Sequence, residues 1–270
     1  MQQKARVYRA YGLQRPLNAW QVLVVAFHIA NAVVFYLAAS LKFDLVHFLI
    51  YTTFCTVAIA AWFYTSLVDA ALPPSGVEKL CCVPFYCFKK AQLKKRYCAV
   101  TRKSVPGMDH YCRWMNTAIG SRNYVGFFTV ISSSTILFIH QGVFSIVSFV
   151  TINFSEPGSV SSTNTVLLNV CSVILFLGAL GGISSHGVLL LFHCYLIKKQ
   201  FGTYDFLIER SKQKRKRAQG NRGQIDKKES GSNGGTVVNK NNKVQDSQND
   251  KSTRGTEAET EEEKAMVQNA

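Results

Sequence analysis

The sequence predicts an all-α integral membrane protein with four transmembrane helices and a cytosolic loop between the second and third helices. Its apolar residues gather in four blocks, at about residues 17–39, 45–68, 125–150 and 166–197, and none of these blocks contains Lys, Arg, Asp or Glu. A helix of roughly 20 apolar residues crosses a hydrocarbon layer of about 30 Å. Each block is long enough, so we expect each to span the membrane once.

The fourth block is too long for one crossing. At 1.5 Å per residue it would reach about 48 Å, so its cytosolic end is expected to continue as helix beyond the membrane. Gly178 and Gly182 form a small-xxx-small step that would let a neighbouring helix approach closely. Glycine is also tolerated in membrane helices without such a role, and the sequence alone leaves both interpretations open.

The distribution of the basic residues predicts the orientation. The chain has 31 Lys and Arg and a net charge of +15. Four of these residues precede the first block, ten lie between the second and third blocks, and sixteen follow the fourth. Since cytoplasmic loops carry an excess of Lys and Arg, both termini and the central segment are expected in the cytosol.

Two regions follow from this pattern. Residues 1–210 are predicted to form the transmembrane domain, with its cytosolic loop at residues 69–124. Residues 211–270 consist largely of Lys, Gln, Asn, Ser, Gly and Glu. Such a segment cannot bury enough apolar surface to offset chain entropy, so it is predicted to be a disordered cytosolic tail.

Several polar residues lie inside the apolar blocks. Polar groups at membrane depth usually face the interior of a helix bundle, and we interpret these as interhelical hydrogen-bonding groups. A membrane di-iron enzyme would need several closely spaced histidine motifs, and none occurs. The residues are His28, Asn31, His140, Gln141, His186 and His193.

The central segment brings an acid, a base and a thiol into four residues: Asp109, His110 and Cys112. In nucleophilic catalysis an imidazole takes the proton of a thiol, the thiolate attacks, and a carboxylate holds the imidazole in the required tautomer. Because short motifs recur by chance, the triplet gains its weight from its surroundings.

Those surroundings carry a family resemblance. The sequence reads Asp-His-x-Cys-x-Trp at 109–114 and Ile-Gly-Ser-Arg-Asn-Tyr at 119–124, with Phe127 shortly after. It resembles the cysteine-rich domain of DHHC protein S-acyltransferases, which also lies between the second and third membrane helices. The resemblance implies that Cys112 is acylated by a long-chain acyl-CoA, such as palmitoyl-CoA. The acyl group then passes to a cytosolic cysteine of a membrane-associated protein.

The resemblance also implies roles for three substrate-binding residues. Trp114 would lie beside the reacting thioester, and Arg113 would belong to basic surroundings that attract the phosphates of CoA. After the fourth helix, the family's Thr-Thr-x-Glu motif stands here as Gly202-Thr203-Tyr204-Asp205. Thr203 would approach Asp109 and help to fix it.

The chain departs from the family at the metal ligands. The family usually has His where Tyr111 stands, although some members carry Asp-His-Tyr-Cys, and two zinc sites normally brace the domain. By resemblance, the ligand positions fall at Pro84, Cys87, Tyr97 and Ser104, and at Cys98, Thr101, Tyr111 and Ala118. A structural zinc site needs four N or S donors. We therefore expect no bound zinc, and a loop braced by the packing of Tyr97, Tyr111 and Trp114.

No nucleic-acid partner is expected, and the resemblance implies a location in the endoplasmic reticulum or Golgi. The main alternative to an enzyme is a catalytically inactive membrane adaptor that uses its loop and tail to bind a partner. A small transporter or channel is disfavoured, because the helices lack paired charges and the chain lacks an inverted repeat.

Overall fold

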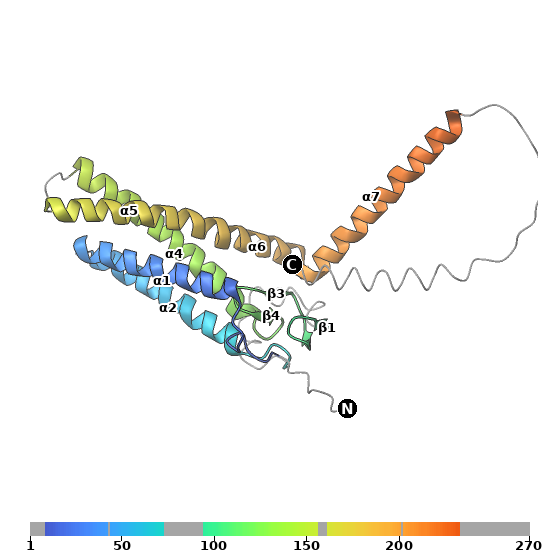
Figure 1. Cartoon of the computed structure of the whole chain (residues 1–270), viewed down its shortest axis with the longest axis horizontal. Helices are drawn as coiled ribbons and strands as arrows, with labels where there is room; N and C mark the ends of the chain where they lie inside the picture. Colours follow the sequence, from blue (N-terminus) through green and yellow to red (C-terminus); the bar gives the residue numbers. More distant parts are fainter. Residues whose placement is uncertain (1–8, 43, 73–93, 156–160, 201, 233–270) are drawn as a thin grey trace, which may run out of the picture. The chain divides into compact units, whose positions relative to one another are not determined.

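The chain divides after Gly202 into two units, residues 1–202 and residues 203–270. The structure is a computed structural model that describes residues 9–42, 44–72, 94–155, 161–200 and 202–232. The first unit contains the long apolar helices and a small loop domain, and the described part of the second, residues 203–232, is one helix (Figure 1).

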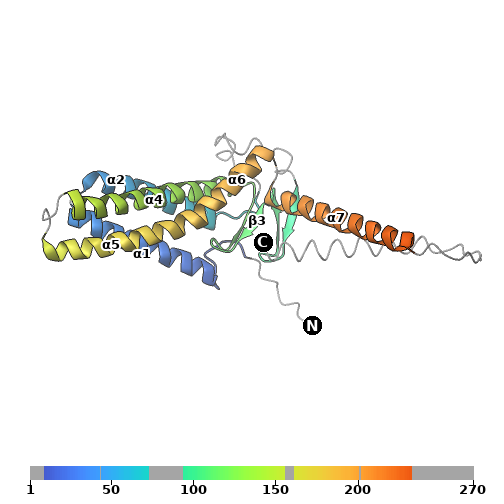
Figure 2. The ribbon, with the colours of Figure 1, turned by 90° about the horizontal axis from the view of Figure 1, so that it is seen from above.

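The four predicted membrane helices are confirmed. They are α1 (Ala19–Lys42), α2 (Leu45–Leu67), α4 (Tyr124–Val150) and α5 (Ser162–Gly182), the last continuing into α6 (Val188–Lys199). Four helical stretches are long and apolar enough to cross a membrane, and the helices run side by side in both views (Figures 1 and 2). The expected extension of the fourth stretch is also present, since α5 and α6 join through a π-helical turn at Ile183–Gly187.

Aromatic and amide side chains hold the helices together. The rings of Phe35 on α1 and Tyr51 on α2 stack with centroids 3.8 Å apart, and Phe144 on α4 packs against Phe35 at 4.8 Å. The Gln141 amide donates hydrogen bonds to Asn31 Oδ1 at 2.8 Å and to a main-chain oxygen of α5 at 2.9 Å. The predicted interhelical role of Asn31 and Gln141 is therefore confirmed.

The close approach predicted at the glycine step is confirmed as well. A Cβ atom added to Gly178 would lie 2.0 Å from Asn31 Oδ1, and one added to Gly182 would lie 2.3 Å from the ring of Phe138. Hydrogen in place of a side chain thus lets α5 pack directly against α1 and α4.

The loop between α2 and α4 forms two β-hairpins at one end of the helices. Strand β1 (Lys95–Cys98) pairs antiparallel with β2 (Lys103–Pro106), and β3 (His110–Cys112) pairs antiparallel with β4 (Thr117–Ile119). Asn116 ends the β3–β4 turn in a left-handed conformation, with φ 54°, which asparagine tolerates better than most residues. Each hairpin is too short to be stable alone, so its conformation depends on packing.

The segment before α1 supplies part of that packing. The Gly12 amide donates to the main-chain oxygen of Ser66 at 2.7 Å, and the Asn116 side chain donates to Gly12 O at 3.1 Å. A Cβ on Gly12 would lie 2.1 Å from Met115 O, so only glycine fits there. Lys103, buried in β2, pairs with Asp69 after α2. These contacts fix the loop both to the segment before α1 and to the residues at the end of α2.

The second unit corrects the predicted tail. Helix α7 spans Thr203–Ser232, so the prediction of disorder from residue 211 is wrong for residues 211–232. This stretch is rich in Lys, Arg and Gln, which have high helix propensity even where no core is formed. The remainder of the predicted tail, residues 233–270, lies outside the described residues.

Candidate active site

The triplet lies on the second hairpin. Side chains alternate along a strand, so His110 and Cys112 project from the same face of β3. Asp109 precedes the strand, and its amide donates to Ile119 O at 2.8 Å, which fixes the entry to the hairpin. The three residues are close because of their spacing in one short strand, as the sequence predicted.

Asp109 and His110 form a buried ion pair. His110 Nδ1 lies 2.8 Å from Asp109 Oδ2, and only 13% of the His110 side chain and 6% of the Asp109 side chain are exposed. Burial by itself lowers the pKa of His110. Hydrogen bonds and charge from Asp109 and Cys112 outweigh that effect and raise the pKa to about 9. The imidazole therefore holds a proton at neutral pH.

Cys112 is buried at the junction of the loop and the helices. Its side chain hydrogen-bonds with His110 and belongs to an apolar cluster with Ala61, Ile119 and Phe127. A protonated imidazole beside a thiol stabilises the thiolate, which is the nucleophilic form. The geometry thus brings together the thiol, imidazole and carboxylate that the sequence predicted as a set, and their roles as nucleophile, base and orienting group stay a prediction.

The structure adds His193, which the sequence pointed to only as a helix-packing group. His193 is on α6 and 1% exposed, and its ring centroid lies 5.7 Å from that of His110. Its Nδ1 lies 3.0 Å from the hydroxyl of Tyr124, the first residue of α4. The interhelical hydrogen bond predicted for His193 is therefore confirmed, and His193 in addition borders the triplet. Because 83 residues separate His110 from His193, no local motif could reveal this contact.

Among the described residues, one group could hold a metal ion: Asp109, His110 and His193, whose ligand atoms lie within 4.8 Å of one another. This group is separate from the positions at which the family resemblance places zinc.

Those zinc positions do not fit the metal. Tyr97 and Ser104 face each other across the first hairpin and are both exposed, while Pro84 and Cys87 lie outside the described residues. At the second set only Cys98 offers a sulfur or nitrogen donor. Four such donors are needed, so no zinc-dependent step is derived, and zinc absence stays a prediction.

Tyr111 stands where the resemblance places a zinc ligand, but its side chain makes a hydrogen bond within the loop. Its hydroxyl donates to Asn116 Oδ1 at 2.7 Å, and Asn116 in turn donates to Gly12 O. This chain of hydrogen bonds anchors β3 to the segment before α1. The predicted bracing by Tyr111 is therefore present, whereas Tyr97 is 61% exposed and the prediction that it braces the loop is wrong. Strand alternation explains the difference, because Cys98 takes the inward position in β1.

The three predicted substrate-binding residues fall in different places. Trp114 is half-buried and packs against the cluster around Cys112, with its ring 5.7 Å from that of His186. Arg113 is exposed at the surface of the loop. Thr203 begins α7 and is the first residue of the second unit, so its approach to Asp109 stays a prediction.

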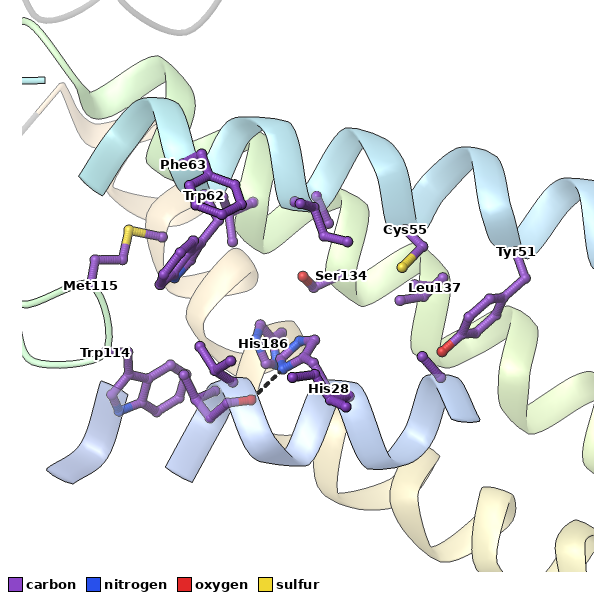
Figure 3. A pocket seen from close by; sticks show the side chains of 17 residues that line it. His28, Tyr51, Cys55, Trp62, Phe63, Trp114, Met115, Ser134, Leu137 and His186 are labelled. Carbon is purple, nitrogen blue, oxygen red and sulfur yellow. Dashed lines mark hydrogen bonds between the residues drawn. The ribbon is translucent and has the colours of Figure 1, made fainter. Parts of the chain in front are cut away.

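A mostly apolar cavity of about 320 Å³ lies among the helices and reaches the loop at Trp114 and Met115 (Figure 3). Its volume is in the range of small-molecule binding pockets. Figure 3 shows Trp114 at one side of the cavity and Tyr51 at the other. The lining residues are Val24, Val25, His28, Ile29, Ala32, Tyr51, Cys55, Ala58, Ile59, Trp62, Phe63, Trp114, Met115, Val130, Ser134, Leu137 and His186.

Comparison with known proteins decides the family. Residues 78–210 match the family described as DHHC palmitoyltransferase. Over residues 78–210 the chain carries a domain of the DHHC palmitoyltransferase family. The matched DHHC region contains the triplet, both membrane helices that follow it and the first residues of α7.

Individual relatives agree with this DHHC assignment. The chain is similar to probable protein S-acyltransferase 15 of Arabidopsis thaliana, with 30% identity over 44% of each chain. It is 32% identical to protein S-acyltransferase 8 of the same plant over 44% of this chain and 29% of that one. The match to palmitoyltransferase erf2 of Emericella nidulans is 42% identical but covers 15% of this chain and 7% of that protein. The chain thus spans less than half the length of these relatives.

Proposed function

We propose that this DHHC protein is a protein S-acyltransferase that moves a long-chain acyl group from acyl-CoA to cysteines of membrane-associated proteins. The observation that carries the proposal is the buried triplet of Asp109, His110 and Cys112 beside the mouth of an apolar cavity. The relatives described as S-acyltransferases support the same reaction class.

In the first step the proton of the Cys112–His110 pair is held by the imidazole, and the Cys112 sulfur attacks the carbonyl carbon of the acyl-CoA thioester as the thiolate. The new Cys112–acyl bond forms as the bond to the CoA sulfur breaks, and His110 returns the proton to the departing CoA thiolate. Asp109 holds the imidazole through Nδ1, so that its other nitrogen serves the sulfur atoms.

The second step repeats this chemistry with a protein cysteine as the attacking group. His110 removes the proton of the incoming thiol, whose sulfur attacks the Cys112 thioester, and Cys112 leaves with the proton restored. Two thioester exchanges replace one direct transfer, which predicts ping-pong kinetics. One thioester is formed for each one broken, so no further reactant is needed.

The cavity explains why the acceptor reaction takes place at a membrane. Trp114 is two residues from Cys112 and contributes to the cavity wall, so an acyl chain on Cys112 would enter between α1, α2 and α4. Burying each CH₂ group there contributes roughly 0.8 kcal/mol. The exposed cations Lys94, Lys95 and Arg113 offer attraction for the CoA phosphates.

The proposed orientation places both termini and the loop in the cytosol, where CoA esters and acceptor cysteines occur. It rests on the excess of Lys and Arg in these segments, and we infer residence in the endoplasmic reticulum or Golgi from the family. Thr203 is proposed to help fix Asp109.

The test is acylation of the purified full chain with a clickable palmitoyl-CoA. We expect a hydroxylamine-sensitive label that is lost in Cys112→Ser and retained in Cys194→Ser, since Cys194 is an exposed thiol on α6. Label that survives Cys112→Ser would exclude Cys112 as the nucleophile. A folded protein that takes no label from any acyl-CoA would instead favour a catalytically inactive adaptor.

A further inference from the structure

We propose that the cavity selects an acyl chain carrying a hydroxyl group near its middle. This hydroxyl would donate a hydrogen bond to one of two histidine nitrogens in the cavity wall. The inference rests on the proposed acyl transfer and names the class of acyl donor. Its basis is the pair His28 and His186, two polar side chains in a wall that is otherwise mostly apolar (Figure 3).

In each histidine, Nδ1 is already used within its own helix. His28 Nδ1 lies 2.8 Å from Val24 O, the contact drawn dashed in Figure 3, and His186 Nδ1 lies 3.2 Å from Gly182 O. His186 Nδ1 also lies 3.0 Å from Ser185 Oγ, whose own proton is donated to Gly181 O at 3.0 Å. A carbonyl oxygen only accepts hydrogen bonds, so the proton of each ring is on Nδ1. The prediction of interhelical hydrogen bonds is therefore wrong for these two histidines.

The other ring nitrogen, Nε2, is left as an acceptor in a neutral imidazole. The ring centroids are 5.2 Å apart, and two positive charges so close in an apolar cavity would repel each other. In the described part of the chain, neither Nε2 has a hydrogen-bond donor, although His186 is only 3% exposed. An acceptor that is covered by apolar groups and has no donor loses its hydrogen bonds to water, which weakens the binding of whatever covers it.

A saturated chain in this cavity would cover both acceptors and satisfy neither. A hydroxyl on the chain would donate to one of them while its methylene neighbours remain in apolar contact. Figure 3 shows the two imidazoles between Trp114 and Tyr51, so the matching hydroxyl lies part-way along the chain. Ser134, which also lines the cavity, offers a hydroxyl that can interact with the oxygen of the same group.

The experiment is a competition for Cys112 between palmitoyl-CoA and hydroxypalmitoyl-CoA isomers, followed by mass spectrometry of the acyl-enzyme. A series of mid-chain hydroxyl isomers is compared with the 2-hydroxy and terminal-hydroxy forms. We expect one or two mid-chain isomers to be preferred over palmitoyl-CoA by roughly tenfold. The 2-hydroxy and terminal-hydroxy chains should show no such preference.

Two variants of each histidine separate a hydrogen bond from cavity shape. In His28→Asn and His186→Asn the amide nitrogen can still donate to the helix carbonyl, but the acceptor at Nε2 is gone. In His28→Gln and His186→Gln an amide oxygen can take the place of Nε2. Because one hydroxyl uses one acceptor at a time, the double Asn variant should abolish the preference, and the double Gln variant should retain most of it.

Val25→Ala is the matched control, since it alters an apolar part of the same wall and should change the use of both chains alike. Equal use of palmitoyl-CoA and every hydroxylated chain would overturn the inference while leaving acyl transfer intact, and would show that the nitrogens bind only water. A preference for the terminal hydroxyl would also overturn it, because that selects the Tyr51 end. Failure of every donor, palmitoyl-CoA included, would instead overturn the proposed function.

Discussion

The substitution Asp109→Asn tests how the carboxylate controls the catalytic base. The amide keeps the size of the side chain and an oxygen that can accept from His110 Nδ1, but it removes the negative charge 2.8 Å away. Without that charge, burial lowers the pKa of His110, and only the contact with Cys112 raises it. The protonated imidazole that supports the thiolate should therefore be lost near neutral pH.

The expected magnitude follows from the pKa of about 9 for His110, compared with the ordinary histidine value of 6.5. At 1.36 kcal/mol per unit, the environment favours the protonated ring by about 3 kcal/mol. At pH 7.5 nearly every His110 is then protonated. A pKa at or below 6.5 in the variant would leave about a tenth of the rings protonated. We expect the rate of Cys112 acylation at pH 7.5 to fall roughly 10- to 100-fold.

The assay is single-turnover formation of the acyl-enzyme between pH 6 and 10. In the unaltered protein the rate should stay high until pH approaches 9 and then decline, as His110 loses its proton. In Asp109→Asn the decline should begin near or below pH 6.5. Asp69→Asn is the matched control, since it removes a half-buried carboxylate that pairs with Lys103 and not with His110.

The raised pKa of His110 also makes the stability of the fold depend on pH. A group whose pKa is raised on folding stabilises the fold below its unfolded value, and the effect disappears as pH rises through the folded value. The His110 contribution to stability should therefore be complete below about pH 6.5 and lost above about pH 9.

An Asp109→Asn protein that keeps more than half of the acylation rate, or whose rate still declines only near pH 9, would refute this account of the base.

Three further predictions concern the brace of the loop. Gly12→Ala should lower the free energy of unfolding by about 1–3 kcal/mol, because the added Cβ would lie 2.1 Å from Met115 O. In a thermal melt the control Gly181→Ala should be tolerated, because the nearest neighbour of its added Cβ is 3.8 Å away. Tyr111→Phe should lower the free energy of unfolding by about 1–3 kcal/mol, because it leaves Asn116 Oδ1 without its donor. The acylation rate of the folded protein should be preserved. A loss of rate at unchanged stability would contradict a bracing role for Tyr111. Elemental analysis of the purified protein should find less than one zinc per chain, and stoichiometric zinc would show that the assumed ligand positions are wrong.

The sequence predicted the membrane helices well because their signal is local. A long run without charge has few stable locations other than a membrane, and the predicted blocks agree with α1, α2 and α4 to within about three residues at most ends. The tail was predicted poorly for the converse reason. Low apolar content excludes a core, but it does not exclude a single helix such as α7, whose residues favour helix locally.

The catalytic triplet was predictable because all three members lie within four residues. Contacts that close over long separations were not: His193 reaches the triplet from α6, and Asn116 reaches Gly12 across 104 residues. Single-sequence patterns describe which residues share a face of one element. They do not describe which elements meet. The interhelical hydrogen bonds predicted for the membrane histidines failed for that reason at His28 and His186, which bond within their own helices, and at His140, whose ring nitrogens are buried without a partner among the described residues.

These long-range contacts also explain how a short loop can hold a reactive geometry. Each hairpin pairs only three or four residues per strand, too few to be stable alone. Tyr111 and Asn116 anchor the second hairpin to Gly12, and Lys103 anchors the first to Asp69, so both are fixed to the chain that enters α1 and leaves α2. The same two helices also supply most of the cavity wall. A change in their packing should therefore alter the position of the triplet and the fit of the acyl chain together, which couples recognition of the chain to the chemistry at Cys112.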